Sequence, residues 1–277
     1  MSHLVCNYLN FGDLSPADAI EAAGAGGFRA SGVRLTGHTP GNGDPGLIDD
    51  AAALRTLSRR AADAGVALVV ANTYRILGER SVEDYRPVLA ACAQLGVRTL
   101  AINCFDPDMA HAADLIGRIA SAAAPYAMSV ALEFIPVSTV PTFTAAVSLM
   151  RATGQPNVGI NVDALHLQRS GGTPDDLAQA PELIASIHLC DAPAIAPEDL
   201  FAEMRAGRLF PGEGQLPLHA ILDAAPAGVE YEIEVPNAAL SHLSPRERAR
   251  RIHDAGMRFL ADHAARSSFS HAAGQSK

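Results

Sequence analysis

Short apolar runs alternate with longer, Ala-rich runs of helical periodicity along the whole chain. This alternation is typical of parallel strands joined by crossover helices. The apolar runs predict eight strands, and their helical counterparts follow them in turn. The expected strands are residues 3–10, 30–36, 67–76, 99–106, 129–136, 158–167, 184–192 and 231–236.

The helical runs complete eight strand–helix units. They lie at residues 15–25, 49–64, 81–95, 109–124 and 142–153, with weaker ones near 174–180 and 216–224 and a last one at 244–265. Ser15-Pro16 supplies an N-cap and a first-turn proline, and Gly65 and Gly96 follow their helices where a left-handed residue is needed. No GxGxxG or P-loop follows the first strand, which disfavours an open doubly wound sheet.

We therefore expect an α/β protein with a single (β/α)8 TIM barrel over residues 1–265, followed by a flexible tail at 266–277. A length of 277 residues fits one such barrel, and 48% hydrophobic residues can bury its core. Residues 193–214 form a long connection after the seventh strand. Connections of this length often carry function.

Charge and cysteine usage narrow the function. The 21 basic and 30 acidic residues give a net charge of −9, which disfavours nucleic-acid binding. No apolar run is long enough to span a membrane, and residues 1–10 contain neither a basic segment nor a long apolar run. The four cysteines form no CxxC pair. We expect a cytoplasmic protein with a small-molecule substrate and no nucleic-acid or membrane partner, and homo-oligomerisation is left open.

Ionisable residues end four consecutive strands, the fifth to the eighth. They are Glu133, Asp163, His188 and Glu234, each flanked by apolar residues. Because strand side chains alternate in direction, these groups face the barrel interior if their neighbours face the helices. Active sites of such barrels lie at the C-terminal strand ends, where the four would converge.

Three carboxylates packed together repel one another unless a cation neutralises them. Three oxygen ligands and one imidazole suit Mn²⁺ or Mg²⁺ better than a thiolate-rich zinc site does. We expect one divalent ion, Mn²⁺ first, with Mg²⁺ or Co²⁺ as alternatives. The alternative without a metal is that each residue has a separate structural role, as an ion-pair partner or a hydrogen-bonded core histidine.

The region 129–237 resembles the xylose isomerase-like barrels, which include sugar phosphate isomerases and epimerases, inosose dehydratases and the endonuclease IV group. The matching elements are Leu132-Glu133-Phe134, Val162-Asp163-Ala164-Leu165-His166, Ile187-His188-Leu189-Cys190-Asp191, Pro211-Gly212-Glu213-Gly214 and Glu232-Ile233-Glu234-Val235. The resemblance implies that Glu133, Asp163, His188 and Glu234 are metal ligands and that His166 lies beside the substrate. In the epimerase branch the two glutamates also move the proton.

Some positions depart from the family pattern or stay open. Glu232 shares a strand face with Glu234 and is an alternative ligand, and the arginine that many ketose epimerases place after the ligand histidine is absent. Arg208 is expected either to clamp the substrate or to lie on the surface. Further candidates for substrate contacts are Arg34, His38, Asn72, Tyr74 and Asn103.

The predicted function is a divalent-metal-dependent isomerase or epimerase of a sugar or sugar phosphate, which removes a proton next to a carbonyl and passes through a metal-stabilised enediolate. The alternative is a lyase or dehydratase on a keto-sugar, keto-cyclitol or dehydroshikimate-like substrate, for which His166 is a candidate acid. An endonuclease would need more metal ligands and a DNA-binding surface. A non-catalytic binding protein would hold no metal.

Overall fold

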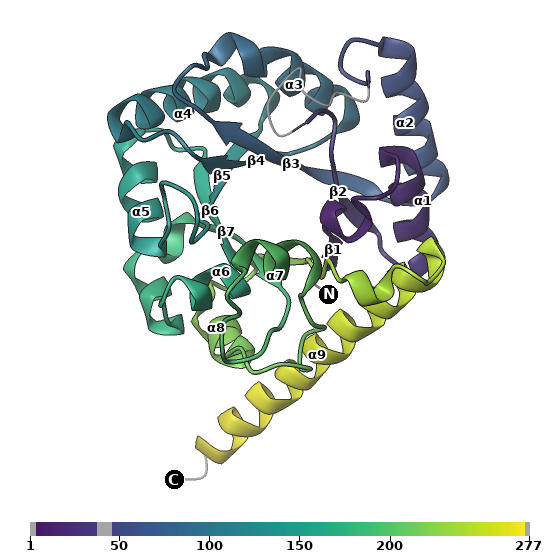
Figure 1. Ribbon diagram of the computed structural model, residues 1–277, viewed down its shortest axis with the longest axis vertical. Coiled ribbons are helices and arrows are strands. Elements are labelled where there is room, and N and C mark those ends of the chain that lie inside the picture. Colours follow the sequence, from purple (N-terminus) through teal and green to yellow (C-terminus); the bar gives the residue numbers. More distant parts are fainter. Residues whose placement is uncertain (1–3, 38–45, 275–277) are drawn as a thin grey trace.

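The computed structural model describes residues 4–37 and 46–274, with side chains as far as Arg266. Its eight strands close into a parallel barrel in sequence order, with β1 paired to both β2 and β8 (Figure 1). The expected TIM barrel is confirmed. The strands are β1 Leu4–Cys6, β2 Ala30–Val33, β3 Ala67–Ile76, β4 Thr99–Cys104, β5 Ser129–Glu133, β6 Val158–Asp163, β7 Ile184–Leu189 and β8 Glu230–Ile233.

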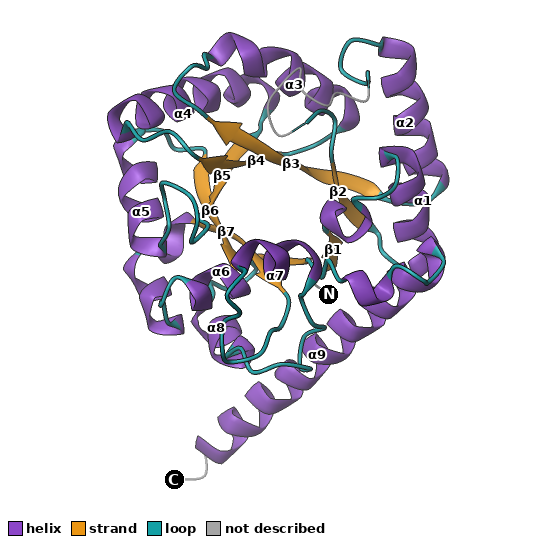
Figure 2. Cartoon of the chain, in the orientation of Figure 1, coloured by secondary structure: helices purple, strands orange, loops and turns teal. Residues whose placement is uncertain are grey.

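Helices surround the barrel, as Figure 2 shows. The α-helices are α1 Pro16–Gly26, α2 Ala51–Asp63, α3 Val82–Leu95, α4 Met109–Ala123, α5 Phe143–Ala152, α6 Ala164–Arg169, α7 Leu200–Ala206, α8 Leu218–Ala224 and α9 Pro245–Gly274. Ser15 caps α1 by accepting from the Asp18 amide, and Gly65 and Gly96 adopt φ of 67° and 74° after α2 and α3. These three expectations are confirmed.

Alternation along β5 to β8 separates the apolar core from the site. Ile187 and Leu189 of β7 are fully buried in the cluster between strands and helices, whereas Ser186 and His188, which alternate with them, face the barrel interior with other polar groups. Ile233 and Val235 flank Glu234 in the same way. The two-residue period therefore directs the ionisable side chains inward.

Every expected strand except β3 ends two to four residues earlier than the sequence pattern indicates, and β1 and β6 differ most. β6 was expected to continue to residue 167, but the Asp163 carboxylate accepts the His166 amide and starts α6 at Ala164. β1 was expected to reach residue 10, but the Asn7 side chain accepts the Leu9 amide and a 3-10 helix, Tyr8–Phe11, follows. In both places a polar side chain satisfies backbone amides locally, which ends the strand.

Three segments have more specific structure than expected. The connection 193–214 contains α7, and the weak helix near 174–180 is the 3-10 helix Pro174–Gln179. The last helix continues to Gly274, past the expected barrel limit at residue 265. The division of the chain at 265 into barrel and flexible tail stays a prediction.

A buried ion pair holds α7 near the C-terminal strand ends. Arg169 of α6 donates to both carboxylate oxygens of Glu203 in α7, at 2.8 and 2.6 Å, and both side chains are buried. Arg169 also donates to the carbonyl of Pro193 at 2.8 Å. This two-pronged contact fixes the orientation of α7, which carries Arg205.

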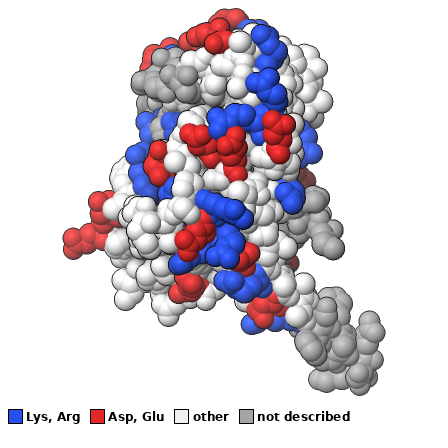
Figure 3. All heavy atoms as spheres, turned by 90° about the vertical axis from the view of Figure 1, so that its right-hand side faces the viewer, with Lys and Arg blue, Asp and Glu red and all other residues white. Residues whose placement is uncertain are grey.

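The face formed by α1, α2 and α9 mixes charges of both signs (Figure 3). Arg60 pairs with Asp18 and Glu21, and Arg251 pairs with Glu247. Arg246, Arg250 and Arg251 of α9 are exposed on this mixed face, whereas Arg248 is buried and pairs with Asp13 at 3.0 Å. Within the described part of the chain, no helix combines the length and apolarity required for a membrane span.

Candidate metal centre and active site

The four strand-end residues converge on one point inside the barrel mouth. Glu133, Asp163, His188 and Glu234 each offer a ligand atom, and these atoms lie within 4.8 Å of one another. All four residues are buried. The structure thus brings the predicted ligands together, and three carboxylates with one imidazole form a donor set that fits a divalent cation.

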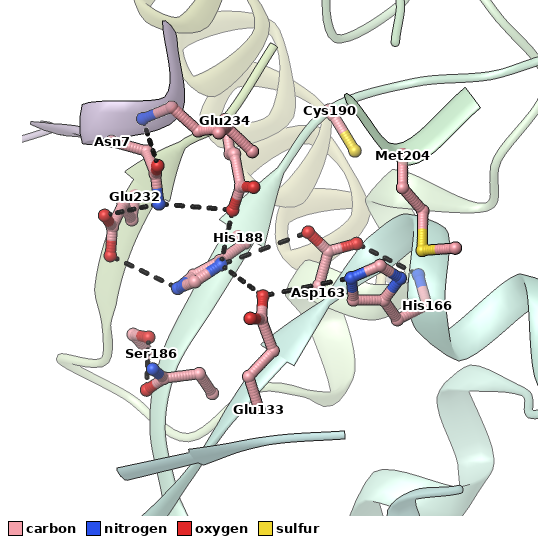
Figure 4. Close-up of polar contacts among 12 residues, drawn as sticks. Asn7, Glu133, Asp163, His166, Ser186, His188, Cys190, Met204, Glu232 and Glu234 are labelled. Carbon is pink, nitrogen blue, oxygen red and sulfur yellow. Dashed lines mark hydrogen bonds and ion pairs between the residues drawn. The ribbon is translucent and has the colours of Figure 1, made fainter. Parts of the chain in front are cut away.

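The imidazole of His188 lies at the centre of this group (Figure 4). Its Nδ1 is 2.9 Å from Glu234 Oε2, 3.2 Å from Glu133 Oε1 and 4.0 Å from Asp163 Oδ2. Because one ring nitrogen faces all three carboxylates, Nδ1 is the atom that would face a cation held by this group.

Glu232 lies on the opposite side of the same ring. Its Oε2 is 3.2 Å from His188 Nε2, and its Oε1 accepts from the amides of Asn7 at 2.8 Å and Asn72 at 3.4 Å. Glu232 is therefore outside the four-residue group. Its place behind the imidazole is that of a carboxylate that orients a metal-ligating histidine.

Arg208 is buried against the four-residue group, with 2% of its surface exposed. It ion-pairs with Asp163, and its Nη2 is 3.3 Å from Glu234 Oε1. Its Nε donates to the Met204 carbonyl at 3.0 Å. The surface alternative for Arg208 is wrong, because the turn after α7 folds back into the barrel mouth through the Asp191–Leu209 bridge.

These contacts control the charges of the group. Burial opposes ionisation of Asp163 and Glu234, but Arg208 and His188 outweigh it and hold the pKa of both carboxyls below the usual range. Burial likewise opposes protonation of His188, yet Glu232, Glu133 and Glu234 raise its pKa well above the ordinary value. A cation that binds Nδ1 must therefore displace a proton.

A cavity of about 760 Å³ opens above the group. Glu133, Glu234 and Arg208 line it, together with His166, Asn103 and Arg34, which were all expected to contact substrate. This volume is sufficient for a small polar substrate. His166 Nε2 is 4.0 Å from Glu133 Oε1.

Four of the lining residues present buried polar atoms with no hydrogen-bond partner among the described residues: Glu133 Oε1, Arg75 Nε, His166 Nδ1 and Asn103 Oδ1. His166 and Asn103 lie beside the four-residue group without belonging to it. Buried polar atoms are normally paired, so both are suited to a ligand that brings hydroxyl groups.

Asn72, Tyr74 and His38 were also expected to contact the substrate. Asn72 contacts Glu232 behind the site, and the Tyr74 side chain is fully buried away from the cavity lining. His38 lies outside the described residues.

Sequence reasoning missed Tyr8, Arg75 and Phe105 in the cavity wall, and it gave Arg205 no role. It also missed Asn7, whose amide donates to Glu232 at 2.8 Å and to Glu234 at 3.1 Å. The sequence does contain a signal for Asn7, because it is a polar residue directly after the apolar run Leu4–Cys6.

The sequence profile of the family described as xylose isomerase-like TIM barrel matches residues 18–263. The chain belongs to this family. Solved structures of similar fold agree with the assignment. The IOLI protein with a binding zinc atom superposes with a TM-score of 0.81 at 19% identity, over 94% of this chain and 99% of that one. D-psicose 3-epimerase in the presence of D-fructose gives 0.68 at 17% identity, over 92% and 96%.

Curated relatives of this xylose isomerase-like barrel include inosose isomerases. The enzyme of Bacillus velezensis is 28% identical over 169 residues, which is 57% of this chain and 60% of the relative. That of Halalkalibacterium halodurans is 32% identical over 112 residues, 39% of each chain. The chain therefore matches about 60% or less of the length of these relatives.

Proposed function

We propose that this xylose isomerase-like barrel is a divalent-cation-dependent isomerase or epimerase of a small sugar, sugar phosphate or cyclitol. The observation that carries the proposal is the convergence of Glu133 and Glu234 on His188 at the closed end of the cavity. The inosose isomerase relatives support the reaction class. The two glutamates come from β5 and from the residue after β8, so they approach a substrate from different sides.

The cation would be held by Glu133, Asp163, His188 Nδ1 and Glu234. When bound, it would supply the positive charge that acidifies the carbon next to a carbonyl and stabilises the resulting enediolate. We propose Mn²⁺, with Mg²⁺ or Co²⁺ as alternatives, because the donors are mainly oxygen. Zinc is the ion of the similar IOLI structure.

The carboxylates are the proposed proton carriers. One glutamate takes the proton from the carbon next to the carbonyl, and the electron pair of the broken C–H bond moves toward the carbonyl oxygen. Epimerisation follows if the other glutamate carries a proton and delivers it to the opposite face. Isomerisation follows if the first glutamate returns its proton to the former carbonyl carbon, while the hydroxyl proton of the carbon that was deprotonated passes to the former carbonyl oxygen. The glutamate that takes the proton must be ionised, and Arg208 keeps Glu234 ionised.

Four further residues are proposed to hold the substrate. His166 and Asn103 would hydrogen-bond its hydroxyl groups through their unpaired buried atoms. Arg208 would contact an oxygen near the reacting carbon, and Arg34 would contact the end of the substrate near the rim. Under this proposal Arg208 both stabilises the carboxylates and orients the substrate.

Turnover of candidate substrates in D₂O tests the reaction class. Metal-loaded protein is incubated with inososes, ketoses and dehydroshikimate-like acids, and products are followed by NMR. We expect deuterium at the carbon next to the carbonyl in an isomerised or epimerised product, without loss of water. Products formed by loss of water would replace the isomerase with the lyase alternative, and no exchange with any compound would overturn both.

A further inference from the structure

Three arginines line the cavity in addition to Arg208 and the glutamates Glu133 and Glu234. Arg34 follows β2, Arg75 lies near the end of β3, and Arg205 belongs to α7, so three segments far apart in the sequence bring guanidinium groups to one cavity. Among the described lining residues, Glu133 and Glu234 are the only carboxylates. The cavity therefore has acidic groups at one place and basic groups elsewhere on its wall.

Among the described residues, no carboxylate compensates the charge of these arginines. Arg34 donates to the Thr36 carbonyl at 3.0 Å and to the Tyr8 hydroxyl at 3.2 Å. Arg75 lies 4.9 Å from the centre of the Phe105 ring, and its buried Nε has no hydrogen-bond partner. No ion pair joins Arg34, Arg75 or Arg205 to a carboxylate whose side chain the structure describes.

The other described arginines that are not exposed all pair with a carboxylate, as Arg169 does with Glu203 and Arg208 does with Asp163. Exposed arginines such as Arg55 and Arg59 have no such partner among the described residues, so the arginines that depart from the usual arrangement are Arg34 and Arg75, which are not exposed. Arginine does not lose its proton in proteins, so the three cavity arginines stay charged and repel one another. Burial lowers the pKa of Arg75, and Arg205 and Arg34 lower it further.

The hydroxyl of Tyr8 adds a neutral donor to this cluster. Burial raises the pKa of Tyr8 to about 12, so the phenol keeps its proton at neutral pH. Its oxygen accepts from Arg34, which leaves the hydroxyl proton available to a ligand. Guanidinium forks and a phenol together match the oxygen atoms of an oxyacid group.

We propose that Arg34, Arg75 and Arg205 form a subsite for an anionic oxyacid group of the substrate, either a carboxylate or a phosphate. The inference rests on the proposed function and narrows it: the substrate is a polyhydroxylated carbonyl compound that carries a negative charge away from the reacting carbon. Its carbonyl end faces Glu133 and Glu234, and its charged end neutralises the arginines.

Anion binding tests the subsite without any catalytic readout. Cation-free protein, dialysed free of chelator, is titrated calorimetrically at low ionic strength with inorganic phosphate, with malonate and with neutral glycerol. We expect phosphate or malonate to bind and glycerol not to bind. Arg75→Met and Arg205→Met should each raise the dissociation constant of the anion by about tenfold or more, the scale of a charge-assisted hydrogen bond.

The control is Arg86→Met on α3, where an exposed arginine pairs with Glu83. It should leave anion binding unchanged. Arg205 is exposed, so Arg205→Met tests the subsite even if Arg75→Met does not fold. The anion that binds more tightly, phosphate or malonate, identifies the oxyacid group of the substrate. Equal anion affinity in wild type and Arg205→Met, or binding of neither anion, overturns the subsite.

A turnover comparison separates this inference from the proposed function. A neutral ketose, its terminal phosphate ester and the corresponding ketouronate are assayed with metal-loaded wild type and Arg205→Met. We expect kcat/KM to be about tenfold or more higher for one charged compound, with that advantage lost in the variant. Turnover of the neutral ketose alone would overturn the subsite and keep the isomerase. Specific anion binding without turnover or exchange of any compound would overturn the isomerase and keep the subsite.

Discussion

Replacement of Glu133 or Glu234 by glutamine is expected to lower turnover by on the order of 10²-fold or more, the scale of a missing general base. Glutamine keeps the size and one oxygen of the side chain but removes the negative charge that accepts a proton. Both variants should fold and retain some metal. Steady-state kinetics and solvent exchange of the substrate proton, measured on metal-loaded protein, test this prediction.

The matched control for these variants is Glu83→Gln, which changes an exposed glutamate of α3 in the same way and should leave turnover unchanged. Exchange should fall together with turnover in at least one of the two site variants. If both metal-loaded variants exchanged the proton and turned over at nearly the wild-type rate, the glutamates would not be the bases. The base would then be sought at His166, whose Nε2 is 4.0 Å from Glu133.

Glu232→Gln is expected to weaken metal binding by about 10- to 100-fold, as is usual when the partner of a metal-ligating histidine is removed. Glu232 faces Nε2 of His188 at 3.2 Å, so its charge fixes the ring and makes Nδ1 a better ligand. Titration of the chelator-treated protein with Mn²⁺ at fixed pH measures the change.

Glu230→Gln provides the control, because Glu230 lies on the same strand two residues before Glu232 and contacts Arg98 at 3.6 Å instead of His188. It should leave the Mn²⁺ affinity unchanged. An unchanged dissociation constant in Glu232→Gln would show that the carboxylate does not support the ligand histidine, and Glu232 would then have only a structural role.

The barrel and the four-residue group could both be predicted from the sequence for the same reason. Alternation of apolar and polar residues locates each strand and gives the direction of its side chains, and parallel strands of a barrel end at one mouth. Glu133, Asp163, His188 and Glu234 therefore had to converge if the eight strands closed. The relative placement of Glu232 followed from the same period of two.

The residues of the cavity wall were harder to predict from the sequence because tertiary contacts determine which residues form it. Arg208 and Arg205 follow from the course of the chain after β7, where Arg169 and Glu203 anchor α7 through a contact between residues 34 positions apart. Arg75 looked like one polar residue in a long strand. Its significance depends on neighbours from β2 and α7, which no local pattern reveals.

The central claim is that Glu133, Asp163, His188 and Glu234 hold one divalent cation. Elemental analysis of Mn²⁺-loaded protein after gel filtration tests it most directly, with the double variant Asp163→Asn/His188→Leu treated in parallel. We predict about one ion per chain in the wild type and almost none in the double variant, since a site of four ligands loses two of them. A wild-type protein without metal, or a double variant that holds as much metal as the wild type, would contradict the claim.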